Sequence, residues 1–440
     1  MATRKLQGPL GGDYQTDGAG NAVLLNSYPL TQEDDVPLRL ADHEARVTAA
    51  EGVQTSQGRG LVAPNPGAAR LNPLPVPMVA PPDLTLSAGG AASSISGGVT
   101  IPWTDSRFRY LGASPVLFSL NSVDYGRVET EQTGQQPSQV VYSVEFECDC
   151  QQIELLMNSQ SAAGRARLWI DGQPTNVTAT TIGTTNFQKR WLVEFAARGN
   201  HHVLLEMMQE TRFAGVTIGP TDSLWATVLP RGPKVSIVGD SYIAAGNLTD
   251  PMQSFVNILS QSLGWRDVRW AGQGGTGYLN PRDTGYRNFL QRITHDVITP
   301  AAEIVIVQGS INDLSTYTTQ QIGDQAEAYY QSVRSNLPAT TTLIVVLPFW
   351  FGANAGSKTV TDNARVEIAA RATDYADLII DPWGEGWYAG TGKTTDLKAD
   401  GNADRYRGSD GTHPTDAGAA YHGRRLASRI AAAMPILGGA

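Results

Sequence analysis

Residues 235–242 read Val-Ser-Ile-Val-Gly-Asp-Ser-Tyr, and this stretch decides the fold of the C-terminal half of the chain. An apolar, β-branched segment that ends in Gly and Asp is typical of a buried strand followed by a tight turn. Similar short apolar segments recur at 267–270, 303–308, 342–347 and 377–380. Helical patterns lie between or after them, near 251–263, 322–336, 361–374 and 416–434. This alternation predicts a parallel sheet with helices on both faces, in which ligands bind at the carboxyl ends of the strands.

The preceding residues, 101–230, show a different pattern. They contain short segments rich in β-branched and aromatic residues, separated by turn signals such as Asp171-Gly172. Short strands at regular spacing, without long helical patterns between them, are typical of an all-β sandwich. We therefore expect a jelly-roll-like sandwich over 101–230 and an α/β domain over 231–440.

The N-terminal residues are expected to form two further regions. Residues 61–90 hold seven prolines, and a Gly- and Ser-rich stretch follows, so 61–100 reads as an extended linker. Residues 1–60 are polar and Gly-rich, with one short helical pattern at Leu38–Glu51. A lone helix of this length is marginally stable in water. We therefore interpret 1–60 as an anchor or oligomerisation region.

The composition of the 440 residues excludes several classes of protein. Lys and Arg total 33 against 42 Asp and Glu, a net charge of −9, which disfavours a role in wrapping nucleic acid. Two cysteines, Cys148 and Cys150, rule out a disulfide scaffold; on a strand they share one face, and we interpret them as buried thiols rather than metal ligands. No apolar run approaches a membrane span, and no signal peptide is visible at the N-terminus. The chain is therefore expected to stay inside the cell, to leave by a signal-independent route, or to be released with a particle.

Two loops that follow predicted strands carry groups suited to acyl chemistry. Ser241 comes directly after the strand at 235–238, where a nucleophile would be exposed near a helix N-terminus. The alternative is that this serine only caps the next helix. Glycines at 272, 274, 275 and 277 allow backbone N–H groups to approach a ligand oxygen, although a flexible loop has the same composition. The Walker lysine is missing, which disfavours a nucleotide site.

Two later loops add the remaining groups. Asn312 follows the strand at 303–308, and its amide is able to donate to an oxyanion, or it forms an ordinary Asx-turn. Asp410 lies three residues before His413, close enough for its carboxylate to accept from the imidazole Nδ1–H and fix the tautomer. Alone, each loop has a structural explanation; together, in this order, they favour a hydrolase site.

These four loops resemble the sequence blocks of the SGNH (GDSL-like) hydrolase family over about residues 232–436. Gly239-Asp240-Ser241 corresponds to the first block, with Tyr242 in place of the family's Leu, and Asn312-Asp313 ends the third block, with Ser310 in place of its usual Gly. The resemblance implies a flavodoxin-like α/β/α domain and hydrolysis of esters. It implies Ser241 as nucleophile, His413 as base and Asp410 as its orienting partner. The oxyanion hole would comprise the N–H groups of Ser241 and Gly275 and the Asn312 side chain, with Gly274 or Gly277 as alternatives to Gly275.

Four further residues are candidate substrate contacts: Asp240, Tyr278, Trp350 and Trp383. The tryptophans follow strands at the site edge and could stack on a sugar ring or simply pack in their loops. No cofactor and no metal site are expected, and the other histidines, such as His295 and His422, are interpreted as structural.

The sequence therefore predicts a serine esterase that removes small acyl groups, acetyl first among them, from a polysaccharide or cell-envelope glycan. A lipase or thioesterase is the enzymatic alternative. From a different class, the architecture resembles bacteriophage tail-associated proteins, which suggests a virion or receptor-binding component, with residues 1–60 joining a homotrimer or other virion proteins. Particle association is then the expected localisation, with the cytoplasm as alternative. A pseudoenzyme is the remaining hypothesis.

Overall fold

A computed structural model describes residues 6–7, 13–16, 22–24, 71–127, 141–159, 164–183, 187–208, 211–246, 248–309, 311–349, 355–388 and 402–433. The chain divides into two compact units, residues 1–53 and 54–440. The first contains a small antiparallel sheet of β1 (Leu6–Gln7), β2 (Asp13–Thr16) and β3 (Ala22–Leu24). The helix expected at Leu38–Glu51 lies outside the described residues.

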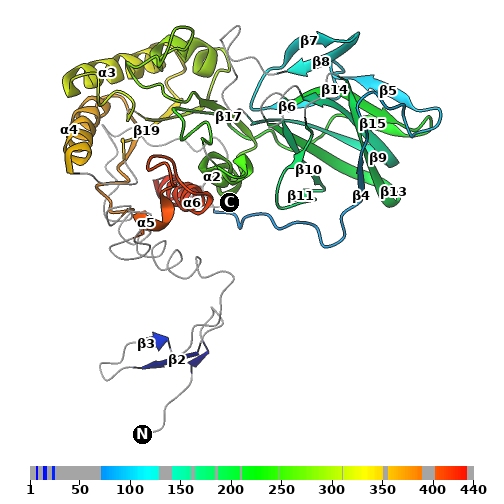
Figure 1. The fold of residues 1–440 in the computed structure, drawn as a ribbon, viewed down its shortest axis with the longest axis horizontal. Coiled ribbons are helices and arrows are strands. Elements are labelled where there is room, and N and C mark those ends of the chain that lie inside the picture. Colours follow the sequence, from blue (N-terminus) through cyan, green and yellow to red (C-terminus); the bar gives the residue numbers. More distant parts are fainter. Residues whose placement is uncertain are drawn as a thin grey trace. The chain divides into compact units, whose positions relative to one another are not determined.

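A 12-stranded antiparallel sheet system, here called the β-rich region, occupies residues 83–225 (Figure 1). Its backbone is a pair of long strands, β9 (Val141–Ser159) and β13 (Lys189–Met208), which pair along most of their length. β10 (Arg165–Ile170) lies beside β13, and β14 (Thr211–Ile218) lies beside β9. The other strands join these four or their neighbours: β4 (Asp83–Leu86), β5 (Val99–Pro102), β6 (Arg109–Leu111), β7 (Val116–Leu120), β8 (Val123–Arg127), β11 (Gln173–Pro174), β12 (Thr180–Thr181) and β15 (Ser223–Trp225).

The core of the β-rich region follows from the alternation of side chains along β9. Even-numbered residues from Val144 to Cys150 are fully buried, and then odd-numbered residues from Ile153 to Met157 are. The inward parity therefore changes near residue 151, opposite a register shift between Glu194 and Gly199 of β13. A bulge of this kind moves the inward face by one residue. The two cysteines are buried on one face, which confirms their interpretation as core thiols.

The prediction of a linker over 61–100 needs correction at its C-terminal end. β4 pairs with β13, and β5 pairs with β14, so this segment supplies strands to the sheet system. Both strands are short, and most of their side chains are half-buried or exposed. Pairing with long neighbouring strands, rather than their own hydrophobic pattern, determines their conformation.

The second part, here called the α/β region, has a five-stranded parallel sheet in the order β17-β16-β18-β19-β20. These strands confirm the five predicted segments: β16 (Lys234–Gly239), β17 (Asp267–Gly272), β18 (Ile304–Gln308), β19 (Thr342–Val346) and β20 (Leu378–Ile380). The order reverses between β16 and β18, and in such sheets ligands bind at this point, beyond the carboxyl ends of the strands.

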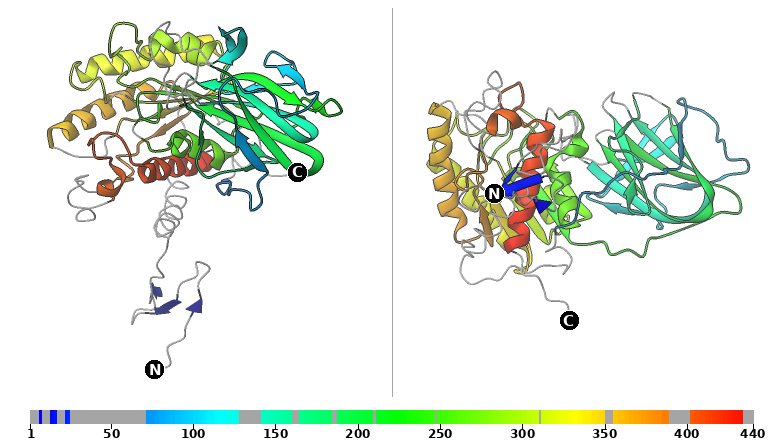
Figure 2. Two further views of the ribbon diagram at one scale, coloured as in Figure 1. Left: turned by 45° about the vertical axis from the view of Figure 1, so that its right-hand side comes forward. Right: turned by 90° about the horizontal axis from the view of Figure 1, so that it is seen from below.

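The predicted helices also form. α2 (Phe255–Leu263) and α6 (Asp416–Ala433) lie on one side of the parallel sheet, and α3 (Thr319–Asn336) and α4 (Ala355–Ala372) lie on the other (Figure 2). Short elements complete the region: η3 (Pro251–Gln253), η4 (Leu290–Arg292), η5 (Thr294–Ile298) and α5 (Ala403–Tyr406). Within the parts of the chain that the structure describes, no helix has the length and apolarity to span a membrane.

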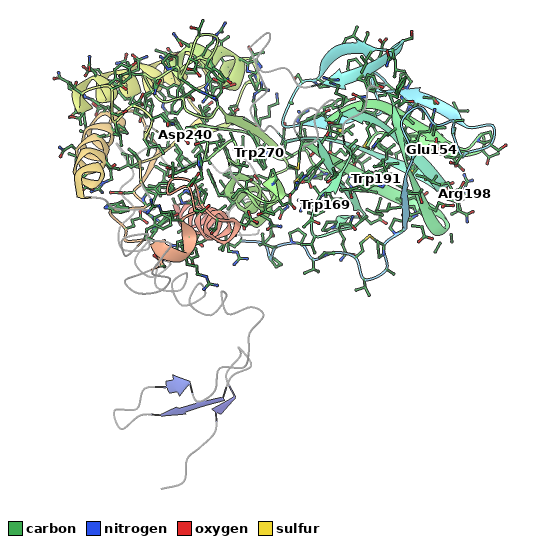
Figure 3. The ribbon with its side chains drawn as sticks, viewed as in Figure 1. Glu154, Trp169, Trp191, Arg198, Asp240 and Trp270 are labelled. Atoms are coloured by element: carbon green, nitrogen blue, oxygen red, sulfur yellow. The ribbon has the colours of Figure 1, made fainter. Side chains whose placement is uncertain are left out.

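The two regions meet along β17, at the edge of the parallel sheet. Glu145 of β9 is fully buried and pairs with Arg109 and with Arg266, the residue before β17. The N–H of Gly112, next to β6, donates to Asp267 Oδ1 at 2.7 Å. Trp270 of β17 lies on the side that faces the β-rich region (Figure 3). Buried polar contacts, not a bare linker, therefore join the regions.

Candidate active site

The loop after β16 presents Ser241 at the carboxyl edge of the sheet. Residues 241–246 form consecutive turns, held by bonds from the Gly246 N–H to the Ser241 carbonyl (2.8 Å) and from the Ala244 N–H to the Asp240 carbonyl (3.0 Å). Ser241 is half-buried, and its own N–H has no acceptor among the described residues. A donor without a partner beside an accessible hydroxyl is the arrangement that an oxyanion site requires.

His413 and Asp410 form the expected pair. The imidazole Nδ1 lies 2.5 Å from Asp410 Oδ2, while the N–H groups of Thr412 and His413 donate to Asp410 Oδ1 at 3.0 Å each. Burial acts to raise the pKa of Asp410, but these N–H groups and the imidazole outweigh it and hold the pKa at about 2. The carboxylate therefore stays ionised and fixes Nδ1 as the protonated nitrogen, leaving Nε2 to act as a base.

The loop of Ser241 and the loop of His413 are held together by Gly246 and Tyr242. A Cβ placed on Gly246 would lie 3.2 Å from His413 Nε2 and 3.1 Å from the Ser241 carbonyl oxygen, so the ring edge and the serine backbone both lie against this glycine. Tyr242 donates its hydroxyl to the Thr412 carbonyl at 2.7 Å, and its ring meets the His413 ring edge-on. Tyr242, one of the two departures from the pattern described above, thus joins the serine loop to the histidine loop.

The glycine loop after β17 supplies backbone donors beside Ser241. A Cβ on Gly274 would lie 3.6 Å from Ser241 Cβ. The N–H groups of Gly274 and Gly275 have no acceptor within the part of the chain that the structure describes, whereas the Gly277 N–H donates to the Asn280 carbonyl at 2.9 Å. Gly277 is therefore excluded as an oxyanion donor, and Gly274 and Gly275 remain.

The Asp313 side chain holds this loop in place through hydrogen bonds. Its buried carboxylate accepts the N–H groups of Tyr278 (2.8 Å), Leu279 (3.1 Å) and Asn280 (2.7 Å), which wraps the loop around one side chain. Asn312, next to it, is half-buried and donates from Nδ2 to the Thr276 carbonyl at 2.9 Å. Consecutive residues after β18 therefore fix the loop and place an amide at its rim.

Comparison with known proteins was made against families, curated sequences and solved structures. Residues 237–421 match the GDSL-like Lipase/Acylhydrolase family. A GDSL lipase of Mycobacterium tuberculosis (strain ATCC 25618 / H37Rv) is 25% identical over 205 residues, which cover 44% of this chain and 80% of that protein. The family match and this relative indicate a hydrolytic, ester-cleaving enzyme.

Two solved structures share the fold. A family two carbohydrate esterase from Cellvibrio japonicus has a TM-score of 0.55 and 15% identity, covering 77% of this chain and 99% of its own. The salicylyl-acyltransferase of a tetracycline biosynthetic pathway has a TM-score of 0.55 and 14% identity, covering 76% of this chain and 95% of its own. At these identities the likeness shows the fold alone. In both cases it covers more of the chain than residues 237–421, so it extends into the β-rich region.

Two predicted substrate contacts of the candidate site are corrected by their burial. Asp240 is 1% exposed and lies inside the α/β region (Figure 3), where its Oδ1 accepts the Tyr242 N–H at 2.9 Å. Burial raises the pKa of Asp240 to about 6. Tyr278 is also 1% exposed, and its hydroxyl bonds that of Tyr330 at 2.8 Å. The side chains of Asp240 and Tyr278 are therefore buried and support the loops of the site by hydrogen bonds. Trp383 is half-buried and remains a prediction, and Trp350 lies outside the described residues.

The described residues contain no group of three or more His, Cys, Asp or Glu side chains arranged to hold a metal ion. Sequence reasoning missed several supporting residues of the site, among them Tyr242, Asp313 and Arg292. Asp313 was visible as the last residue of the third block. Nothing in the sequence marks Arg292, because the two carbonyl groups that it binds, those of Ala271 and Gly239, lie 21 and 53 residues earlier in the chain.

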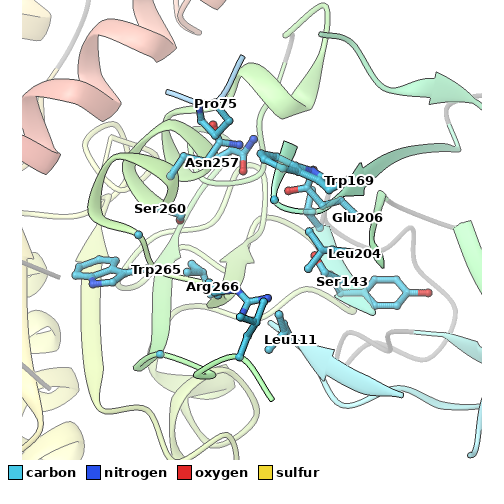
Figure 4. Close-up of a pocket in the computed structure, with 18 of the residues that line it drawn as sticks. Pro75, Leu111, Ser143, Trp169, Leu204, Glu206, Asn257, Ser260, Trp265 and Arg266 are labelled. Carbon is cyan, nitrogen blue, oxygen red and sulfur yellow. The ribbon is translucent and has the colours of Figure 1, made fainter. Parts of the chain in front are cut away.

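A separate cavity of about 500 Å³ lies between the β-rich region and α2 (Figure 4). Trp169, Leu204 and Glu206 line it from the β-rich side, and Asn257 and Ser260 line it from α2. Trp169 donates from its ring nitrogen to Glu206, so the carboxylate is already partnered. None of the proposed catalytic side chains borders this cavity.

Proposed function

We propose that this chain is a serine esterase of the GDSL-like type that removes small acyl groups, acetyl first among them, from a polysaccharide or cell-envelope glycan. The observation that carries the proposal is the convergence, around Ser241, of an oriented His413–Asp410 pair and backbone N–H groups that have no acceptor among the described residues. In this reading the α/β region is a three-layer flavodoxin-like domain, and the β-rich region is a jelly-roll-like sandwich.

Each group has one role in the proposed reaction. Ser241 Oγ attacks the ester carbonyl, and His413 Nε2 takes its proton and returns it to the leaving alcohol. Asp410 holds the imidazole in the required tautomer and stabilises the imidazolium. Water then gives a proton to His413 and attacks the acyl-enzyme; the ester bond to Ser241 Oγ breaks, His413 returns the proton to Ser241 Oγ, and the acid product leaves.

The oxyanion is assigned to the N–H groups of Ser241 and Gly275 and to the Asn312 amide. Asn312 uses one N–H to bind the Thr276 carbonyl, while its contact with Asp240 is long, at 3.3 Å. We assign the N–H on that longer contact to the oxyanion. Gly275 is preferred to Gly274 because Arg282 Nη1 donates to the Gly274 carbonyl at 3.3 Å. The Gly274 carbonyl and the Gly275 N–H belong to the same peptide group and point in opposite directions when it is trans. The Gly275 N–H is therefore directed away from Arg282.

The decisive experiment compares wild type with Ser241→Ala on p-nitrophenyl acetate, with Asp410→Asn as a second variant. We expect Ser241→Ala to lose activity to near background and Asp410→Asn to retain a small fraction. Equal rates for Ser241→Ala and wild type would reject the assignment. Release of acetate from an acetylated polysaccharide, dependent on Ser241, tests the glycan part of the proposal.

Two observations favour rival acyl chemistries. The curated relative is described as a lipase, so acetate and palmitate esters should be compared; a preference for palmitate would overturn the small-acyl assignment. One of the two structures reported above is an acyltransferase, so the products should be analysed with an alcohol added as acceptor. Transfer in excess of hydrolysis would replace the esterase by a transferase.

Association with a virion remains a separate proposal that rests on residues 1–60. It is tested by light scattering on the full chain, where we expect a trimer. A clean monomer would contradict a trimeric tail element without affecting the esterase proposal.

A further inference from the structure

We propose that Arg292 is a positioning residue that ties the nucleophile loop to the oxyanion loop. The inference rests on the proposed function. Arg292, at the end of η4, donates from Nη2 to the Gly239 carbonyl at 2.6 Å and from Nη1 to the Ala271 carbonyl at 2.5 Å. Gly239 ends β16 and directly precedes Asp240 and Ser241, while Ala271 lies one residue before the end of β17. One guanidinium group therefore joins the two strands at the edge where the site lies.

The guanidinium is held rigidly in this position. Its side chain is 4% exposed, Nη1 also pairs with Asp296 Oδ2 at 2.7 Å, and the group lies 5.1 Å from the centre of the Phe289 ring. Asp296 is fixed in turn, because His295 Nδ1 lies 2.9 Å from its Oδ1. A planar donor with a buried counter-ion keeps two acceptors at a set separation, which the single ammonium of lysine does not.

This position matters because regular pairing stops there. The ladder between β16 and β17 ends at Gly239 and Gly272, and one backbone bond, from the Gln273 N–H to the Gly239 carbonyl (3.1 Å), extends it. Ser241 and Gly275 lie beyond that point, on separate loops, yet they must serve one oxyanion. A misplacement of about 1 Å costs on the order of 100-fold in rate. Arg292 fixes the spacing between the bases of the two loops without touching the reacting atoms.

Arg334 provides a matched control at the opposite edge of the same sheet. It donates from Nη1 to the Thr341 carbonyl (2.7 Å) and from Nε to the Tyr375 carbonyl (2.8 Å), and it pairs with Asp377 (2.7 Å). These acceptors precede β19 and β20, at the amino ends of the strands. Arg334 thus makes the same kind of bridge with a side chain that is 14% exposed, against 4% for Arg292, but away from the site.

The test compares Arg292→Lys with Arg334→Lys in the full chain. We expect both variants to lose thermal stability, but kcat on p-nitrophenyl acetate should fall about 10- to 100-fold only in Arg292→Lys, with KM little changed. The double variant Arg292→Gln/Asp296→Asn removes the buried charge pair together and should show the same kcat loss if the single variant fails to fold. A kcat near wild type in the folded Arg292 variants, or an equal loss in Arg334→Lys, would overturn the proposal.

A second readout does not depend on catalysis. Amide hydrogen exchange should accelerate at residues 240–246 and 273–280 in Arg292→Lys and not in Arg334→Lys. Unchanged hydrogen exchange in these loops would contradict the positioning role of Arg292 even if activity fell. If wild type showed no Ser241-dependent activity, the proposed function would fail, whereas the exchange comparison would still decide the role of Arg292.

Discussion

Replacing Gly277 by alanine should disturb catalysis through Asp313, without touching any group proposed to react. A Cβ on Gly277 would lie 2.5 Å from both Cγ and Oδ1 of Asp313, and Oδ2 is nearer still. Because real Cβ contacts essentially never fall below 3.0 Å, the loop and the carboxylate must separate by at least about half an ångström. The carboxylate cannot yield easily, since it is buried and accepts three backbone N–H groups of the same loop.

The displacement sets the expected magnitudes. Overpacking of this kind costs about 1–3 kcal/mol of stability. A shift of that size in the loop that carries Gly275 should lower kcat about 10- to 100-fold, equivalent to about 1.4–2.7 kcal/mol of transition-state stabilisation. The assay is the steady-state rate on p-nitrophenyl acetate, with the free energy of unfolding measured in urea.

Gly172→Ala is the control. Gly172 has φ +82° and nothing within 4 Å of an added Cβ, so alanine there costs only backbone strain of about 1–2 kcal/mol. The Gly172→Ala variant should lose about as much stability as Gly277→Ala, while its kcat should remain that of wild type. A folded Gly277→Ala with wild-type kcat would refute the argument that Asp313 shapes the oxyanion loop.

Three further predictions concern the site and its surroundings. Asn312→Ala should lower kcat about 10²–10³-fold with nearly unchanged stability; a wild-type rate would remove Asn312 from the oxyanion hole. The pKa of Asp410 is about 2 in the folded chain against an ordinary 3.8, so its contribution to stability is present above pH 4 and is lost as the pH falls from about 4 to 2. The gap in Tm between wild type and Asp410→Asn should close over that range, and a constant gap would contradict this linkage. Burial lowers the pKa of His422 to about 3 from 6.5, and its ring bonds Tyr388 and Gln308. Neutral His422 therefore stabilises the fold above pH 6.5 and loses this effect as the pH falls toward 3. The free energy of unfolding in urea should be measured at pH 7.5 and at pH 5 for wild type and His422→Asn. The decrease between the two pH values should be smaller for the variant.

The α/β region could be read from the sequence because its strands are buried on both faces. Continuous apolar runs such as 304–308 then mark each strand, and the polar residues after them mark the site edge. The same logic led to the prediction of Ser241, Asn312 and His413 as site residues. It failed for β4 and β5, which are short and lie among Pro-, Gly- and Ser-rich segments, and whose strand conformation depends on pairing with β13 and β14.

Candidate site residues that lie in a sequence motif could be predicted from the sequence. Residues whose role depends on tertiary packing could not. Asp240 and Tyr278 occupy motif positions, yet the turns that follow each strand direct their side chains inward. Sequence spacing alone does not show which way a loop residue faces. Arg292 reaches Gly239, 53 residues earlier in the chain, and only the packing of η4 under β16 and β17 brings them together.

The contact of Gly112 with β17 bears on how this protein could be divided or rearranged. A side chain at Gly112 would collide with the Val268 carbonyl, so the β-rich backbone lies directly on the outer edge of the parallel sheet. Cutting the chain at 231 would uncover that edge, remove Glu145 as the partner of Arg266 and the Gly112 N–H that donates to Asp267, and leave an open template for aggregation. The α/β region therefore cannot be transferred to another protein by itself. A chimera that joins it to another domain would have to keep the residues around β6 and β9 as well, and natural exchange of the upstream region would face the same constraint.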